Sequence, residues 1–170
     1  MTMKPKVSII MGSTSDMPVM EAAADFFNKM EIPFEINALS AHRTPNEVET
    51  FATQAQERGI EVIIAAAGMA AHLPGVIAAM TTLPVIGVPI NVSFNGLDAA
   101  MSIMQMPPGI PVATVAVNGA LNSAILALQI MSTNNPEYQK KMHEYKATLK
   151  DKIIKANQDI KKIEYKFKTN

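Results

Sequence analysis

Five short apolar runs, each followed by a longer amphipathic segment, constrain the fold of this chain more than any other feature. Val, Ile and Ala dominate the runs, and few polar residues interrupt them. Strands that are buried on both faces of a parallel sheet have this composition, because helices cover the two sides. We therefore expect strands at Val7–Met11, Phe34–Leu39, Val62–Ala67, Val85–Val88 and Ala113–Val117.

The segments between the runs carry helix signals. Asp16 is suited to cap a helix that begins near Met17-Pro18, since proline is tolerated in a first turn. Thr44-Pro45-Asn46-Glu47 has the pattern of a capping box and opens a helix that Gly59 closes. This order of elements predicts a doubly wound α/β sandwich with helices on both faces of the sheet. The other helices are expected at Leu73–Thr82, Leu97–Gln105 and Ala120–Ser132.

The segment from Pro136 to about Lys168 differs from the rest of the chain. Its apolar residues recur every three or four positions, which predicts one long amphipathic helix. A five-stranded domain is too small to cover such a helix, so we expect it to pack against a neighbouring subunit; a bare surface helix is the alternative. Residues 1–135 would then form a catalytic α/β domain, and residues 136–170 a helical extension of it.

Composition argues against several classes of protein. The start of the chain lacks the apolar region of a signal peptide, and no apolar run approaches the roughly 20 residues that cross a bilayer, so we expect a soluble cytoplasmic protein without membrane contact. The ten lysines after residue 135 alternate with five acidic residues and include no arginine, which indicates a solvated helix face and no nucleic-acid surface.

Two kinds of bound group are also disfavoured. Cysteine is absent, and His42 and His72 are the only histidines before the tail, so we expect no metal site. Tryptophan is absent and all three tyrosines lie in the tail, which argues against a flavin stacked on aromatic rings.

Polar side chains follow the first two predicted strands, at the edge of a parallel sheet where ligands bind. After the first strand, Gly12-Ser13-Thr14-Ser15-Asp16 could hold an anion at a helix N-terminus, although a Ser/Asp turn that only caps the helix is an equal alternative. After the second, His42 can exchange protons and Arg43 can bind phosphate through its forked donors. The alternative is that Arg43 pairs with a surface glutamate while His42 caps a loop.

Two further segments are weaker candidates. His72 follows the third predicted strand, and a lone histidine among alanines is more often structural than catalytic. Met101 and Met104 stand at helical spacing before a proline-rich loop, and such methionines are usually core residues. The loop after them could cover a pocket.

Four motifs nevertheless occur together: Met-Gly-Ser-Thr-Ser-Asp at 11–16, Ser-Ala-His-Arg-Thr-Pro at 40–45, Ala-Ala-His-Leu-Pro-Gly at 70–75, and Ser-Ile-Met-Gln-Met-Pro-Pro-Gly-Ile-Pro-Val at 102–112. With these motifs, residues 5 to 135 closely resemble the 5-(carboxyamino)imidazole ribonucleotide mutase family of purine biosynthesis. The resemblance implies a flavodoxin-like three-layer fold, a homo-octamer and a reaction without cofactor or metal. The reaction moves a carboxylate from the exocyclic nitrogen of an aminoimidazole ribonucleotide to the adjacent ring carbon.

The resemblance also implies roles for individual residues. His42 would transfer protons, while Met69 stands where glycine is frequent and would narrow the pocket wall. Two alternatives stay open: direct carboxylation of aminoimidazole ribonucleotide with carbon dioxide, and a non-catalytic phosphosugar-binding oligomer. The residues that would bind the ribonucleotide or line its site are Ser13, Asp16 and Arg43, with Ser15 and Ser40 at the phosphate and Ala70, His72 and Leu73 over the carboxylate.

Overall fold

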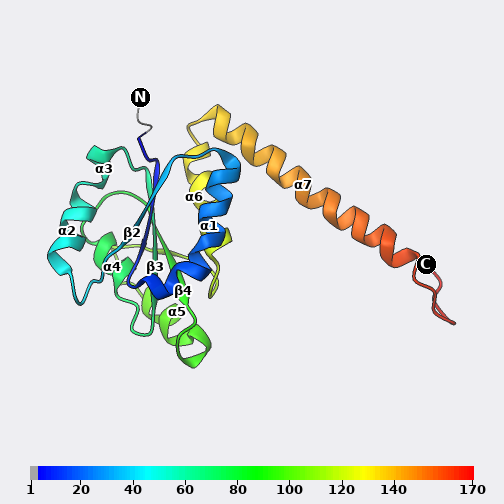
Figure 1. The fold of residues 1–170 in the computed structure, drawn as a ribbon, viewed down its shortest axis with the longest axis horizontal. Helices are drawn as coiled ribbons and strands as arrows, with labels where there is room; N and C mark the ends of the chain where they lie inside the picture. The colour runs from blue at the N-terminus through cyan, green and yellow to red at the C-terminus, as the bar shows by residue number, and fades with distance from the viewer. Residues whose placement is uncertain (1–3) are drawn as a thin grey trace. The chain divides into compact units, whose positions relative to one another are not determined.

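A computed structural model describes residues 4–170. Met1–Met3, which belong to the segment expected to lack a signal peptide, lie outside the described residues. The chain divides into two compact units that meet between Met131 and Ser132 in the sequence. The first unit contains a parallel five-stranded sheet of order β2-β1-β3-β4-β5 (Figure 1). The strands are β1 (Val7–Met11), β2 (Phe34–Ala38), β3 (Val62–Gly68), β4 (Val85–Ile90) and β5 (Ala113–Thr114).

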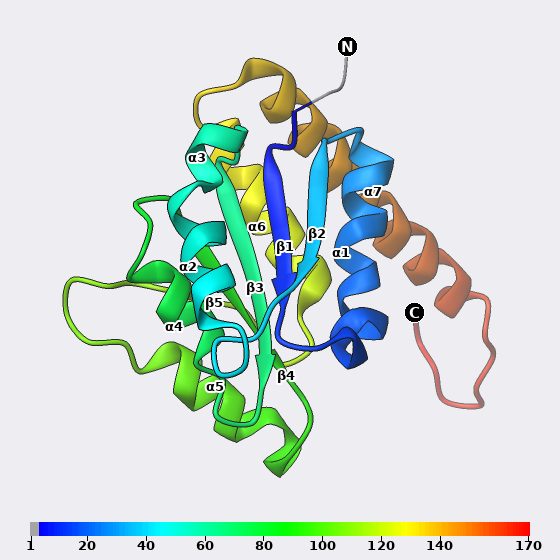
Figure 2. The ribbon, with the colours of Figure 1, turned by 60° about the vertical axis from the view of Figure 1, so that its left-hand side comes forward.

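Helices cover both faces of this sheet, so the predicted doubly wound α/β sandwich is confirmed (Figures 1 and 2). One face carries α1 (Met17–Met30) and α6 (Ala120–Ser132). The other carries α2 (Pro45–Thr53), α3 (Ala55–Arg58), α4 (Leu73–Ala78) and α5 (Leu97–Met104). Strand order and direction are those of the flavodoxin-like topology.

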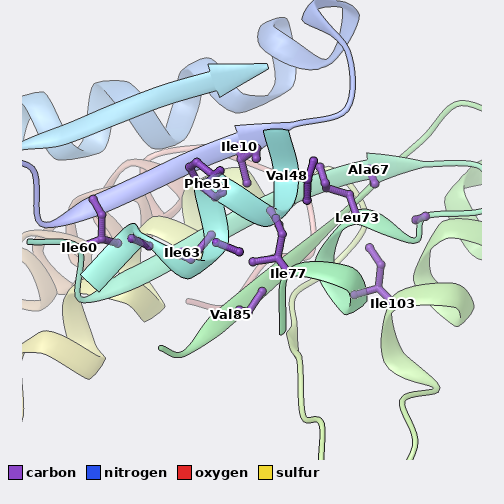
Figure 3. Close-up of a cluster of buried hydrophobic side chains, with 14 of the residues drawn as sticks. Ile10, Val48, Phe51, Ile60, Ile63, Ala67, Leu73, Ile77, Val85 and Ile103 are labelled. Carbon is purple, nitrogen blue, oxygen red and sulfur yellow. The ribbon is translucent and has the colours of Figure 1, made fainter. Parts of the chain in front are cut away.

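A buried cluster joins the sheet to the helices of the second face (Figure 3). Ile10 and Ile63 project from the strands, and Phe51 and Ile77 come from the helices over them. Leu73, at the start of α4, belongs to the same cluster. Burial of these side chains therefore anchors the segment that leads from β3 into α4.

Burial on both faces holds for β1, β3 and β4 but is wrong for β2. β2 lies at the edge of the sheet and is only half-buried, and Ile36 remains exposed. Glu35 of β2 is one of the polar side chains at this edge, and it accepts hydrogen bonds from the Ser8 hydroxyl at 2.9 Å and from Arg58 Nη2 at 3.1 Å. The other edge strand, β5, is shorter than predicted and ends at Thr114.

The helix predicted from Thr44 to Gly59 is interrupted at Gln54, which separates α2 from α3. The hydroxyls of Thr50 and Thr53 donate to the carbonyl oxygens four residues earlier, at 3.0 and 2.8 Å. Hydroxyls that bond backward in this way bend helices, because they compete with the backbone ladder. α4 is also shorter than predicted and ends at Ala78.

The second unit consists mainly of α7 (Pro136–Lys161), which Asn135 caps through hydrogen bonds from the amides of Glu137 and Tyr138. The helix ends at Lys161 and not near Lys168, so the last part of the predicted stripe is not helical. Beyond this end the chain folds back, and Lys168 Nζ donates to the carbonyl oxygens of Ile160, Lys161 and Ile163 at 2.8 to 2.9 Å, which satisfies groups that a helix C-terminus leaves unpaired. Within residues 4–170, no helix has both the length and the apolar character needed to cross a membrane.

Candidate active site

The register of the sheet brings three loops together. Met11, the last residue of β1, pairs with Ala38 of β2 on one side and Ala66 of β3 on the other. The segments that leave these three strands therefore start beside one another at the carboxyl edge of the sheet. This is the edge at which ligands bind in open α/β folds.

A pocket of about 530 Å³ lies between these segments. All nine residues predicted for the site line it, although they come from three loops spread over sixty positions of sequence. Gly12, Ala41, Ala67, Gly68, Met69 and Val92 complete the lining. The nine predicted residues are Ser13, Ser15, Asp16, Ser40, His42, Arg43, Ala70, His72 and Leu73.

The loop after β1 does not use Asp16 as a helix cap, so that prediction is wrong. Ser13 caps a short 3-10 turn instead, and its hydroxyl accepts hydrogen bonds from the amide of Ser15 at 3.3 Å and from the Ser15 hydroxyl at 2.9 Å. Helix α1 continues directly from that turn, and no side chain caps its first residues. Asp16 is consequently released from capping and lies buried in the pocket wall.

Burial raises the pKa of the Asp16 carboxyl above its ordinary value of 3.8, and a hydrogen bond from Ser15 partly opposes the shift. The folded chain therefore holds this proton more tightly than the unfolded chain does. The stability contributed by this group is complete below pH 3.8 and is lost as the pH rises through the raised pKa. At neutral pH, the buried charge costs stability.

We expect Asp16→Asn to raise the melting temperature at pH 7, because the amide keeps the shape of the side chain without the charge. The gain should shrink as the pH falls toward the raised pKa, which thermal unfolding followed by circular dichroism at several pH values will measure. A gain in melting temperature that does not depend on pH would contradict the stated cause.

The loop after β2 is shaped by Thr44, which does not form the predicted capping box. Its hydroxyl accepts a hydrogen bond from the Ser40 amide at 2.8 Å and donates one to the Ser40 carbonyl at 3.1 Å. These two bonds close the loop on itself. His42 and Arg43 are thereby presented at its tip.

Arg43 is held in place without being neutralised. Its Nη2 donates to the carbonyl of Gly12 at 3.0 Å, and its amide and Nε donate to the Ser40 hydroxyl at 3.3 and 3.4 Å. Within residues 4–170, no carboxylate lies at ion-pair distance from Arg43, so the surface-glutamate alternative is wrong. Arg58 is different, because it pairs with Glu35 and lies over the Phe51 ring. Arg43 thus retains its positive charge and its donors for an anion.

His42 meets His72 across the pocket. Nε2 of His42 lies 2.8 Å from Nδ1 of His72, and the ring centroids are 4.9 Å apart with an angle of 75° between the planes. The two residues follow different strands and are thirty positions apart in the sequence. The structure therefore brings His42, the candidate proton carrier, into direct contact with His72.

Two pocket residues outside the predicted set are Met69, in the loop after β3, and Val92, after β4. Met69 adopts a left-handed backbone with φ of 56°, a conformation that glycine adopts more readily than other residues. Its side chain is exposed beside the pocket. Val92, after β4, was missed, since an isolated valine beyond a strand carries no sequence signal. Residues 4–170 contain no cluster of three histidine, cysteine or carboxylate side chains suited to a metal ion.

A sequence model described as AIR carboxylase matches residues 6–152. The chain belongs to the AIR carboxylase family. The family match includes the three pocket loops and the first part of α7. It therefore extends past residue 135, where the resemblance carried by the motifs ends.

Curated relatives of this AIR carboxylase-family chain are similar over most of its length. The N5-carboxyaminoimidazole ribonucleotide mutase of Pyrococcus abyssi is 57% identical over 147 residues, covering 86% of this chain and 84% of the relative. The mutase of the same name from Thermotoga maritima is 53% identical over 163 residues, covering 95% of each. A crystal structure of a Treponema denticola PurE2 variant has a TM-score of 0.85 at 30% identity, covering 94% of this chain and all of that one.

Proposed function

We propose that this chain is a 5-(carboxyamino)imidazole ribonucleotide mutase of purine biosynthesis, which forms 4-carboxy-5-aminoimidazole ribonucleotide. One observation carries the proposal: a single pocket joins an unneutralised arginine to a histidine pair, in a chain similar over nearly its full length to proteins named as this mutase. The arginine suits the phosphate of a ribonucleotide. The histidine pair suits proton transfer near neutral pH.

The substrate is held by its phosphate and ribose, away from the reacting atoms. Arg43, Ser13 and Ser15 surround the start of α1, where the helix dipole also favours an anion. Asp16 is placed to accept hydrogen bonds from ribose hydroxyls. Ser40 fixes the Arg43 side chain and assists the phosphate through it. Binding energy gained here positions the aminoimidazole ring over the histidines.

The reaction then proceeds by two proton transfers at one group. His42 in its protonated form gives a proton to the exocyclic nitrogen, the nitrogen–carboxylate bond breaks, and carbon dioxide and neutral aminoimidazole ribonucleotide result. The ring carbon attacks carbon dioxide and forms the new carbon–carbon bond. His42, now neutral, removes the proton from that carbon and returns to its starting state, so no proton is gained or lost overall.

The far wall of the pocket suits the retention of carbon dioxide. Ala67, Gly68, Ala70 and Met69 offer small or apolar groups over the site. A small uncharged molecule is retained best by a wall of this kind once the substrate closes the entrance and water is excluded.

The test of the function is turnover without bicarbonate. Purified protein should convert substrate labelled with ¹³C in its carboxylate, in carbon-dioxide-free buffer, into product that keeps the label. Added unlabelled bicarbonate should neither accelerate the reaction nor dilute the label, because the carbon dioxide formed stays in the pocket. His42→Asn protein in the same buffer corrects for spontaneous decarboxylation.

Direct carboxylation is the competing outcome of this experiment. A strict bicarbonate requirement, with loss of the label from the product, would establish it and reject the mutase. Relatives named phosphoribosylaminoimidazole carboxylase exist in yeasts, for example at 47% identity in Saccharomyces cerevisiae, but this chain spans only 28% of that protein. The relatives that match this chain in length are named as mutases, which favours the first outcome.

We also propose that the enzyme is a cytoplasmic homo-octamer. Met101 and Met104, expected in the core, are exposed on α5, and Phe94 and Leu97 beside them are also exposed. Exposed apolar side chains gathered on α5 and the turn before it favour self-association, and the apolar stripe of α7 offers a second surface for neighbouring copies. Light scattering on the purified protein measures the number of copies, and a monomer would reject this assembly. The charged substrate does not cross membranes unaided, which supports the cytoplasm as the place of action.

A further inference from the structure

The contact between His42 and His72 limits where protons can be in the pocket. A neutral imidazole has one N–H donor and one acceptor nitrogen, and a protonated imidazole has two donors. The 2.8 Å separation of His42 Nε2 and His72 Nδ1 therefore requires a proton on only one of these two nitrogens. If both rings were fully protonated, two N–H groups would face each other and the bond would be lost.

The same contact leaves one nitrogen of His42 for the substrate. Nε2 is engaged by His72, and Nδ1 has no hydrogen-bond partner among residues 4–170. His72 is suited to this task because it stands at the N-cap position of α4 without using its side chain to cap the helix. Its neighbour Leu73 is buried in the core, so the backbone that carries His72 is firmly anchored.

We propose that His72 is a positioning residue for His42, which holds Nε2 of His42 by a hydrogen bond and so leaves Nδ1 to exchange the proton with the substrate. This inference rests on the proposed mutase reaction and adds a role to it. The other charged side chains that line the pocket are Asp16 and Arg43, and neither is hydrogen-bonded to either ring.

The proton count of the reaction is satisfied by the pair. Before turnover, His42 carries protons on both nitrogens, and its Nε2–H donates to Nδ1 of His72. Loss of the Nδ1 proton to the exocyclic nitrogen leaves a neutral His42 whose Nε2–H still donates to His72. Nδ1 is then the free base that removes the ring-carbon proton. The hydrogen bond persists through both transfers, so the ring does not need to turn between them.

Two substitutions of His72 separate this role from simple lining of the pocket. Asparagine places an amide atom where Nδ1 of histidine lies and can still bond to His42, whereas glutamine places its amide beyond that position. We expect His72→Gln to lower kcat about tenfold to a hundredfold with little change in KM, which is the range that corresponds to losing a hydrogen bond to a charged group. His72→Asn should recover most of that loss.

A spectroscopic measurement tests the hydrogen bond without substrate. In ¹⁵N-histidine-labelled full-length protein, the imidazole ¹⁵N shifts of His42 should indicate hydrogen-bonded Nε2 in the wild type and in His72→Asn, but not in His72→Gln. His143 is an exposed histidine of α7 and serves as the internal reference for a free ring.

The outcomes are distinct. Equal kcat losses in the asparagine and glutamine variants, a rise in KM in place of a fall in kcat, or His42 shifts equal to those of His143 would each overturn the positioning role. If the wild-type protein fails to convert the substrate, the proposed function is rejected, while the shifts still decide whether His72 holds His42.

Discussion

His42→Asn should lower kcat by about 100- to 10,000-fold while substrate affinity changes little, because general acid–base catalysis is typically worth this much. Asparagine fills most of the space of the imidazole but cannot take up or release a proton near neutral pH. Single-turnover assays with the carboxyamino substrate measure the loss, and equilibrium binding of the product measures the retained affinity.

His143→Asn is the matched control, since it is the same chemical change at an exposed position of α7. It should leave kcat and KM at wild-type values. His42→Gln adds a second comparison, because its longer side chain can still reach His72 but transfers no proton. Full activity of His42→Asn would remove His42 from the reaction, and equal losses in His42→Asn and His143→Asn would point to a general effect of substitution.

Arg43→Ala should raise KM about 10- to 100-fold, the range that corresponds to losing hydrogen bonds to a charged group. Arg43 has no carboxylate partner within residues 4–170, so its removal breaks no ion pair and should leave the melting temperature nearly unchanged. Steady-state kinetics and thermal unfolding of the same preparation measure both quantities.

Arg58→Ala offers the opposite expectation. Arg58 pairs with Glu35 at 3.1 Å and covers the Phe51 ring, so its loss should lower the melting temperature and leave KM unchanged. The two arginines of the chain therefore separate binding from stability. A KM that is unaffected in Arg43→Ala would take Arg43 out of the phosphate site.

Much of the fold could be predicted because its signals are local. Runs rich in Val, Ile and Ala marked the central strands β1, β3 and β4, and Pro18, Pro45 and Pro74 stand in the first turns of helices as expected. The predictions that failed depended either on the order of the strands in space or on side-chain hydrogen bonds formed within a helix. The edge position of β2 follows from strand order, and the break at Gln54 follows from hydroxyls that turn back onto the helix.

The capping predictions failed for a related reason. Asp16 and Thr44 both stand at positions where their side chains could cap a helix, yet the Asp16 carboxylate accepts a hydrogen bond from the Ser15 hydroxyl and the Thr44 hydroxyl bonds to the backbone of Ser40. Which partner is chosen depends on the path of the loop, and that path depends on the packing of the helices that follow. The consequence for the site is direct, because an Asp16 that does not cap is available in the pocket.

The sequence by itself determined that Gly12–Asp16 and Ser40–Arg43 belong to one site, because parallel strands place the loops at their carboxyl ends along the same edge of the sheet. Only the tertiary structure decided what the side chains do there. It left Arg43 unpaired, buried Asp16 so that its pKa rises, and joined His42 to His72. These relations depend on distances between atoms of loops that are about thirty residues apart, which the order of residues along the chain does not specify.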